Sequence, residues 1–319
     1  MNKVVKKILK FKCGEEDIIF PVAYIEGESE GPTLAIIGGM HGSEFCGIEA
    51  PIKLLKDIEA NKLKIKGKLI ITTIYNVPAF RENTAFIVPE DNKNPLRLFP
   101  GKEKGSYTEV MNYYFWNEVL QDIDYCIELH GGDIPEKIAN CIYVPIVDDE
   151  KTDSISKKMA EIYDIKYIIH TEMNKENKYG GAYSRLAFKG VPSILAEAGG
   201  NGLLDNLNTE VHYNGIKNIM IYLNMLENEN IKDTEERIIL NYTGSIKSDI
   251  DFGMWYPLVD TGDFVKNGDI IGEIRDYFGD KIKDIKASYD GIVCILKTSP
   301  SLKENDSLVE INKVKLLKY

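Results

Sequence analysis

Apolar and polar positions along the first two-thirds of the chain follow two alternating patterns. Short runs rich in β-branched residues predict buried strands at residues 33–39, 68–74, 125–129, 141–145, 166–170 and 193–197. Apolar residues at helical spacing predict helices over residues 44–60, 108–120, 154–163 and about 211–226. Strands that alternate with helices predict an α/β fold, in which helices cover both faces of a sheet.

The pattern changes after an acidic, polar segment at residues 227–236. From about residue 238, short β-type runs are separated by turns such as Asp-Thr-Gly, Asn-Gly-Asp and Tyr-Asp-Gly, which is typical of a small all-β module. We therefore predict two domains, residues 1–240 and 241–319. Residues 78–105 are rich in Pro, Asn and Gly and lack periodicity, and loops of that length in a compact domain are usually functional or disordered.

Composition narrows the class of protein. The chain has 319 residues, with 44% hydrophobic and 28% charged residues, which is ordinary for a globular protein. A net charge of −11 argues against nucleic acid or an anionic membrane as the main partner, but it leaves an anionic small substrate open. Lysines interrupt the first apolar run, and no run is long enough to span a membrane, so we expect a soluble, cytoplasmic protein without a signal peptide.

The five cysteines provide neither a disulfide framework nor a thiolate zinc site, because their number is odd and no two have Cys-x-x-Cys spacing. Histidine is scarce, with four residues in the chain. His41 stands in Gly-Gly-Met-His-Gly-Ser-Glu, between a predicted strand and a predicted helix, and Glu44 falls in the first helical turn. An imidazole and a carboxylate at this spacing suit zinc. The alternative is an ordinary helix start with a capping serine and an acidic residue near the positive end of the dipole.

A second histidine, His130, also ends a predicted strand and is followed by two glycines. Alone it could be a core imidazole, but with His41 and Glu44 it forms a set of two histidines and one carboxylate. Three protein ligands leave a position for water, which is typical of a catalytic zinc. Glu197 ends another apolar strand, where it could remove a proton from that water and return it to a leaving amine. The alternative for Glu197 is a structural carboxylate that bonds a nearby helix terminus.

These motifs, with Phe-Pro-Gly at residues 99–101 between them, resemble the succinylglutamate desuccinylase/aspartoacylase family of zinc deacylases. The nearest branch resembles N-acetyl-diaminobutyrate deacetylases. The resemblance implies a zinc-carboxypeptidase-like mixed sheet with helices on both faces and a C-terminal lipoyl-like β domain. It also implies one Zn²⁺ on His41, Glu44 and His130, with Glu197 as general base.

The chain departs from the family pattern in the long loop. Arg97 matches a family arginine that grips the substrate carboxylate, but Leu96 stands where the family has Asn. A further arginine that stabilises the oxyanion is absent from residues 84–86, and Arg81 is the nearest substitute. Arg185 resembles an arginine that binds a substrate or acyl carboxylate, and its alternative is a surface helix residue.

The remaining polar candidates receive smaller roles. We assign Asn94 to substrate binding or, together with Asp133, to orienting the imidazoles. Residues 179–183 could line the cleft or simply connect two elements. We expect His170 and His212 to be structural.

The main hypothesis is a zinc-dependent amidohydrolase that removes the acyl group from a small N-acylated amino acid or amine. A peptidase acting on short peptides, as in the related carboxypeptidases, is the first alternative. A metal-binding or sensor protein with little turnover is the second. The expected partner is a small-molecule substrate, without nucleic acid or membrane, and a homo-oligomer remains open.

Overall fold

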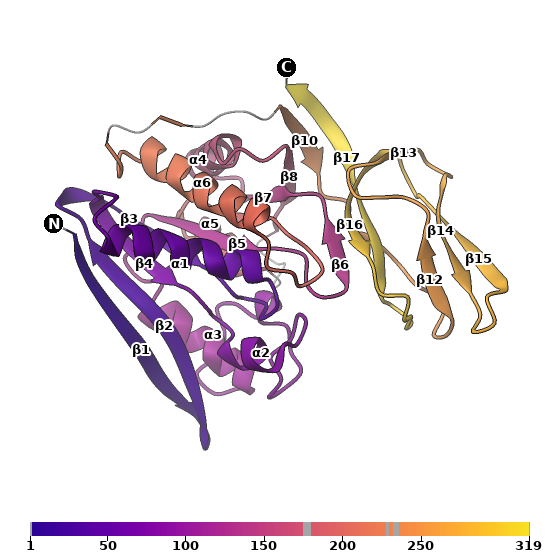
Figure 1. Cartoon of the computed structure of the whole chain (residues 1–319), viewed down its shortest axis with the longest axis horizontal. Coiled ribbons are helices and arrows are strands. Elements are labelled where there is room, and N and C mark those ends of the chain that lie inside the picture. The colour runs from indigo at the N-terminus through magenta and orange to yellow at the C-terminus, as the bar shows by residue number, and fades with distance from the viewer. Residues whose placement is uncertain (1, 175–179, 228–229, 232–235, 319) are drawn as a thin grey trace.

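The computed structural model describes residues 2–174, 180–227, 230–231 and 236–318. Residues 316–318 are described by their backbone alone. One large mixed sheet runs through the molecule, and helices cover its central part (Figure 1). Among the described residues, no helix is long and apolar enough to cross a membrane. The predicted fold class, an α/β region followed by a β-rich region, is confirmed.

The strands of the α/β region make up the first part of this sheet, in the order β1-β2-β4-β3-β5-β9-β7-β8-β10. They are β1 (Lys3–Cys13), β2 (Glu16–Glu26), β3 (Ser29–Ile37), β4 (Lys66–Thr72), β5 (Tyr125–His130), β7 (Cys141–Ile146), β8 (Tyr167–Glu172), β9 (Ser193–Glu197) and β10 (Arg237–Asn241). Strands β4, β3, β5 and β9 are parallel, β7 runs antiparallel to β9, and β8 and β10 continue parallel to β7.

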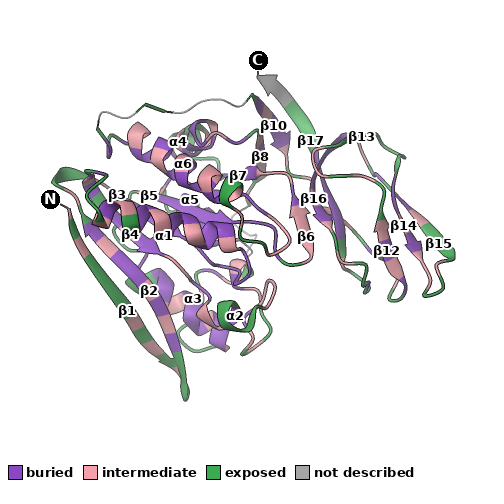
Figure 2. Ribbon diagram, in the orientation of Figure 1, coloured by how far each residue is buried: buried purple, intermediate pink, exposed green. Residues whose placement is uncertain are grey.

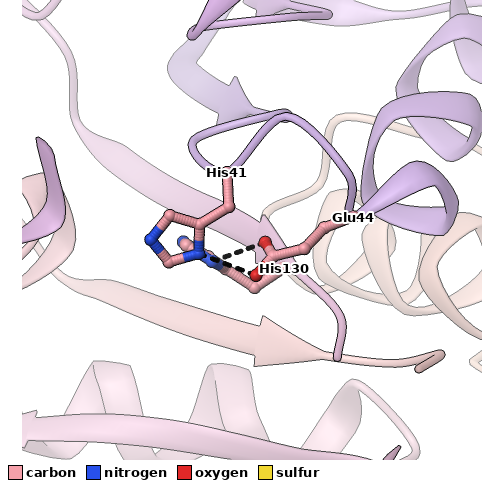
Figure 3. Close-up of side chains that lie close together, drawn as sticks. All are labelled: His41, Glu44 and His130. Carbon is pink, nitrogen blue, oxygen red and sulfur yellow. Dashed lines mark hydrogen bonds and ion pairs between the residues drawn. The ribbon is translucent and has the colours of Figure 1, made fainter. Parts of the chain in front are cut away.

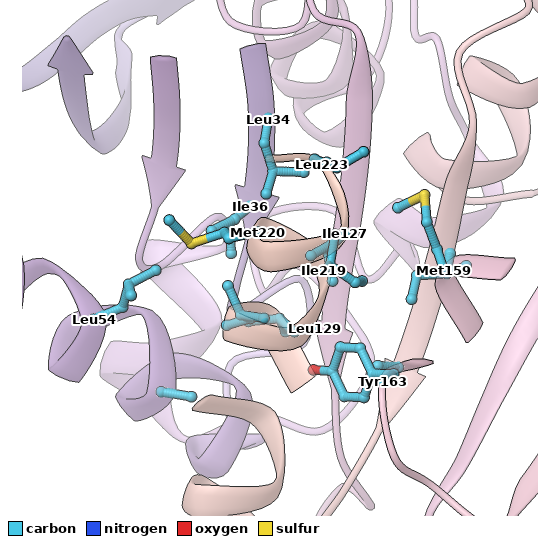
Figure 4. Close-up of a cluster of buried hydrophobic side chains, with 14 of the residues drawn as sticks. Leu34, Ile36, Leu54, Ile127, Leu129, Met159, Tyr163, Ile219, Met220 and Leu223 are labelled. Atoms are coloured by element: carbon cyan, nitrogen blue, oxygen red, sulfur yellow. The ribbon is translucent and has the colours of Figure 1, made fainter. Parts of the chain in front are cut away.

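Helices α1, α4 and α6 pack on one face of the sheet and α3 and α5 on the other. The helices are α1 (Phe45–Glu59), α2 (Val77–Glu82), α3 (Tyr107–Glu118), α4 (Glu150–Ile162), α5 (Ala182–Phe188) and α6 (Asn206–Tyr222), with a short 3-10 helix η1 (Pro95–Arg97). Side chains along strand β5 point alternately to the two faces of the sheet. Ile127 and Leu129 join the apolar core beneath α1, α4 and α6 (Figure 4), and Cys126 joins the core beneath α3 and α5.

The predicted helices and strands are present, with shifted ends. The helix predicted from about residue 211 begins at Asn206, because the carboxylate of Asp205 accepts a hydrogen bond from the Asn208 backbone N–H at 2.8 Å and so caps it. The antiparallel hairpin β1–β2 at the edge of the sheet was not predicted. Most of β1 is exposed (Figure 2), so its sequence lacks the buried apolar run that marks the central strands.

The β-rich region contributes the rest of the large sheet and a separate three-stranded sheet, β12-β14-β15. Its strands are β11 (Ser245–Lys247), β12 (Met254–Pro257), β13 (Phe264–Val265), β14 (Ile270–Arg275), β15 (Lys281–Lys286), β16 (Gly291–Lys297) and β17 (Ser307–Lys318), and β6 (Glu136–Ile138) pairs with β16. The region has its own apolar core, which includes Trp255 and Leu308. The division at residue 240 stays a prediction; that residue lies inside β10, which pairs with β8 and with β17.

Candidate metal centre and active site

The candidate metal ligands meet where parallel strands end. The chain leaves β3 at Ile37 and turns through His41 into α1, and Glu44 immediately precedes that helix rather than lying in its first turn. His130 is the last residue of β5, which lies parallel to β3, so both chain segments reach the same edge of the sheet. Gly42 permits the tight turn after His41, because a Cβ there would stand 2.3 Å from the Ala79 backbone.

The three side chains touch one another (Figure 3). Glu44 Oε1 lies 2.7 Å from His41 Nδ1, and Glu44 Oε2 lies 2.8 Å from His130 Nδ1. One ligand atom from each residue falls within 4.8 Å of the others. All three side chains are buried, with His130 only 1% exposed. The structure therefore brings together the three residues that the sequence predicted as metal ligands.

The outer nitrogens of the imidazoles face oxygen acceptors. His41 Nε2 lies 3.3 Å from Asn94 Oδ1, and His130 Nε2 lies 3.0 Å from Glu128 Oε1. These partners favour a proton on Nε2 of each ring, so in the neutral form of each ring Nδ1 directs a lone pair toward the side chain of Glu44. Both oxygens of the buried Glu44 carboxylate therefore face a ring nitrogen, Oε1 that of His41 and Oε2 that of His130. Converging lone pairs on nitrogen and oxygen fit a divalent cation such as zinc.

The electrostatics of the cluster agree with this ligand set. Burial opposes the ionisation of Glu44, but the two imidazoles lower its pKa to about 2. Burial likewise opposes the charged form of His130, while Glu44 and Glu128 raise its pKa well above the usual range, so a bound cation would displace the proton that this ring otherwise holds. Glu44 is therefore a carboxylate at neutral pH, as a metal ligand must be.

Glu128 was not among the predicted site residues. It is fully buried on β5, and its second oxygen, Oε2, accepts the backbone N–H of Tyr183 at 2.9 Å. The sequence carried a signal for it, because residues two apart on a strand point to the same face and Glu128 precedes His130 by two. A buried carboxylate that holds both His130 and the first turn of α5 links the candidate metal centre to a helix.

Glu197 stands beside the cluster. It is the last residue of β9 and pairs directly with His130 across the parallel strands. Part of its surface is exposed. Burial raises the pKa of its carboxyl well above the usual range, Glu44 adds to that rise, and His130 works against it.

Asp133 does not orient an imidazole by hydrogen bonding. Its carboxylate accepts the hydroxyl of Ser43 and the backbone N–H groups of Phe86 and Ile134, the latter two at 2.6 and 2.9 Å. It therefore ties the long loop to the turn that carries His41.

His212 is fully buried and lies outside the candidate ligand set. Its Nε2 lies 2.7 Å from the carbonyl oxygen of His130, and its Nδ1 lies 2.9 Å from the Tyr163 hydroxyl. Burial lowers its pKa to about 4, so the ring is neutral at pH 7.

The predicted arginines occupy three different places. Arg97 is exposed at the end of η1. Arg185 is half-buried on α5, two residues after Tyr183 and so on a different side of the helix. Arg81 lines a surface cavity of about 1000 Å³ between α2 and the β1–β2 hairpin, and none of the three candidate ligands lines it.

The long loop approaches the candidate metal ligands at Phe86. This is the part of the loop, residues 84–86, in which the family pattern has an arginine. The Phe86 ring packs edge-on against His41, with 5.8 Å between ring centroids. Leu96 packs with both neighbouring apolar clusters, and Asn94 accepts the Leu96 backbone N–H at 2.9 Å. Asn94 therefore both shapes η1 and contacts His41. Of the possible cleft wall at residues 179–183, residue 179 lies outside the described residues.

Residues 30–223 match the succinylglutamate desuccinylase/aspartoacylase catalytic domain. The chain belongs to this family. The resemblance noted from the sequence is thereby confirmed.

Among curated proteins, this desuccinylase/aspartoacylase-family chain is similar to the N-alpha-acetyl-L-2,4-diaminobutyric acid deacetylase of Halomonas elongata. The identity is 26% over 303 residues, which cover 93% of this chain and 86% of the relative. The family is therefore one of deacylating hydrolases that act on small acylated molecules.

Solved structures show the same fold over almost the whole chain. A succinylglutamate desuccinylase from Silicibacter sp. TM1040 aligns with a TM-score of 0.86 at 21% identity, covering 98% of this chain and 95% of its own. The product-bound ectoine utilization protein EutE of Ruegeria pomeroyi aligns with a TM-score of 0.84 at 22% identity, covering 97% and 95%. At these identities the likeness concerns the fold.

Proposed function

We propose that this protein is a zinc-dependent amidohydrolase that removes the acyl group from a small N-acylated amino acid. The observation that carries the proposal is the buried His41–Glu44–His130 cluster, with both Nδ1 atoms directed at Glu44 and with Glu197 paired beside His130. The acetyl-diaminobutyrate deacetylase relative makes N-acetylated amino acids the first substrates to test.

His41, Glu44 and His130 would hold one zinc ion, and Asn94 and Glu128 would keep the two rings oriented. When bound, zinc supplies Lewis acidity: it polarises an acyl carbonyl and lowers the pKa of a water molecule to about 7. The protein contributes the fixed geometry, because all three ligands are held by buried segments at the end of the sheet.

Glu197 would carry the proton. Its carboxylate would accept a proton from the attacking water and deliver it to the nitrogen of the leaving amine as the amide bond breaks. Burial and the nearby carboxylates raise its pKa, which brings it toward the range where a carboxyl can both accept and release a proton near neutral pH. Its partly exposed position leaves it accessible to substrate.

Arg97 would bind the carboxylate of the substrate, because it is an exposed cation on the loop that also supplies Asn94. Arg185 remains a candidate for a second anionic group on the acyl side. Arg81 is a weaker candidate than the sequence indicated, because it faces a separate cavity.

The test is a panel of N-acetyl and N-succinyl amino acids with zinc-loaded and chelator-treated protein, in which the released amine is measured. We expect release that requires zinc and that stops when the metal is removed. Hydrolysis confined to dipeptides would favour a peptidase instead. Equal activity with and without metal would contradict the proposal.

A further inference from the structure

A histidine on helix α6 holds the end of the strand that carries His130. His212 is fully buried, and its Nε2 atom lies 2.7 Å from the carbonyl oxygen of His130. A carbonyl oxygen can only accept, so Nε2 of His212 carries a proton and donates this hydrogen bond. The helix therefore contacts the candidate ligand through its backbone and leaves the imidazole of His130 to face Glu44.

A tyrosine fixes this proton on Nε2. The Tyr163 hydroxyl lies 2.9 Å from Nδ1 of His212, and a neutral imidazole has one donor and one acceptor nitrogen. Because Nε2 is the donor, Nδ1 accepts the hydrogen bond of the Tyr163 hydroxyl. Tyr163 directly follows α4 and is fully buried in the apolar core (Figure 4), so both nitrogens of His212 have fixed partners.

Helix α6 is shaped to admit this tyrosine. Gly215 lies three residues after His212 and so on the same side of α6, and a Cβ at position 215 would stand 2.2 Å from the Tyr163 ring. Glycine in the interior of a helix destabilises that helix relative to alanine. The residue at this position therefore favours the close approach of Tyr163 over the stability of the helix alone.

The carbonyl oxygen of His130 also joins two strand ends. It accepts the backbone N–H of Ala198 at 3.2 Å, and Ala198 directly follows Glu197. Glu197 itself pairs with His130 across the parallel strands β5 and β9. One oxygen atom thus connects His212, the candidate ligand and the residue after the candidate base. A donor at this oxygen restrains the ends of both strands at once.

We propose that His212 is a positioning residue, which fixes the placement of the metal ligand His130 relative to the general base Glu197 through the carbonyl oxygen of His130. This inference rests on the proposed function, to which it adds a residue that acts through the backbone. Misplacing a catalytic group by about 1 Å can slow a reaction about 100-fold. Loss of this contact should therefore affect turnover more than substrate binding.

The test replaces His212 with one residue that keeps a donor and one that removes it. Glutamine places an N–H group near the position of Nε2, whereas leucine has no donor. For zinc-loaded His212→Leu, we expect kcat on the best N-acetyl amino acid to fall about 10- to 100-fold, with KM almost unchanged, because removing a partner that orients a metal site has effects of this size. His212→Gln should recover most of the turnover. If His212→Leu does not fold, His212→Met provides a more adaptable side chain without a donor.

Asn218→Leu is the matched control. Asn218 is also buried on α6, and its side-chain amide donates to the carbonyl oxygen of Ile162, on helix α4, at 2.9 Å. Both leucine variants lose a buried hydrogen bond, so both should unfold at a lower denaturant concentration than the wild-type protein. Only the His212 variant should lose turnover per folded, zinc-loaded molecule. Wild-type kcat in His212→Leu, or an equal loss in Asn218→Leu, would show that His212 only stabilises the fold and would overturn the inference.

Metal spectra separate this inference from the proposed function. Co²⁺ accepts the same nitrogen and oxygen ligands as Zn²⁺, and its visible absorption depends on their geometry. We expect the Co²⁺ spectrum of His212→Leu to differ from that of the wild-type protein, and the spectrum of His212→Gln to match it. If the wild-type protein hydrolyses no substrate, the proposed function fails, and these spectra then decide the role of His212. In that case identical spectra for all three proteins would overturn it.

Discussion

The α/β region and the β-rich region bury apolar side chains equally well but place polar ones differently. In the α/β region, β5 and β9 end in His130 and Glu197, and these meet at one edge because the strands are parallel. The β-rich region is built from antiparallel strands around Trp255 and Leu308, and its buried Glu310 accepts the hydroxyl of Tyr143 in the α/β region. The comparison indicates that the strand ends of the first region gather the candidate site residues, while the second region forms a separate apolar core.

The largest expected effect is on the metal. His130→Ala removes a ligand and leaves Glu44 buried beside a cavity, so we expect zinc content to fall from about one equivalent to near zero and hydrolysis to be lost. Metal analysis of the purified variant checks this. His170→Ala, at a histidine outside the cluster, should keep its zinc; loss of zinc there would argue against the assigned ligand set.

Glu197→Gln tests the general base. We expect zinc to stay bound and kcat to fall about 10²- to 10⁴-fold, the usual contribution of a positioned proton acceptor. Glu172→Gln changes another strand-end carboxylate, on β8, and should leave kcat unchanged. Wild-type turnover by the Glu197 variant would show that the chemistry does not depend on this strand end.

Glu128→Gln tests the residue that holds His130. A glutamine can satisfy either His130 or Tyr183 but presents no charge, so zinc affinity should fall about 10- to 100-fold. Competition with a chromogenic chelator measures this affinity. An unchanged zinc affinity would mean that the hydrogen bond to Nε2 does not tune the ligand.

Leu308→Ala sharpens the contrast between the regions. Leu308 is fully buried in the core of the β-rich region, so its truncation should lower the free energy of unfolding by about 2–5 kcal/mol. Denaturant unfolding measures the loss, and the folded variant should still bind one zinc. Loss of zinc from the folded variant would show that the metal centre depends on the second core.

The smallest expected effect concerns the start of helix α3. Glu109 accepts the Ser106 backbone N–H at 3.0 Å and pairs with Lys102 at 2.7 Å, and these contacts lower its pKa to about 2. Its folded pKa lies below its unfolded value, so it stabilises the protein above about pH 4.5 and the effect is lost as pH falls toward 2.

Glu109→Gln should therefore cost about 1 kcal/mol at pH 7 and almost nothing near pH 2. Unfolding free energies of the two proteins across this pH range provide the measurement. A difference that does not depend on pH would show that the charge of Glu109 is not involved.

Local patterns in the sequence were sufficient for the central strands, the covering helices and the three candidate ligands. His41, Glu44 and His130 could be predicted because each stands at the end of an apolar run, and parallel strands bring such ends together whatever else the chain does. Glu128 was also within reach, since the two-residue period of a strand puts it beside His130. The edge hairpin β1–β2 was missed because exposure removes the apolar pattern that identifies a strand.

Tertiary structure alone decided which groups far apart in the sequence lie together. Asn94 reaches His41 from a loop without periodicity, Arg81 turns to a separate cavity, and Glu310 arrives from a strand almost 170 residues after Tyr143. Such contacts depend on how loops and a second core pack against the sheet. Residue types and spacing along the chain determine which elements form, but they do not encode the distance between side chains that only packing brings together.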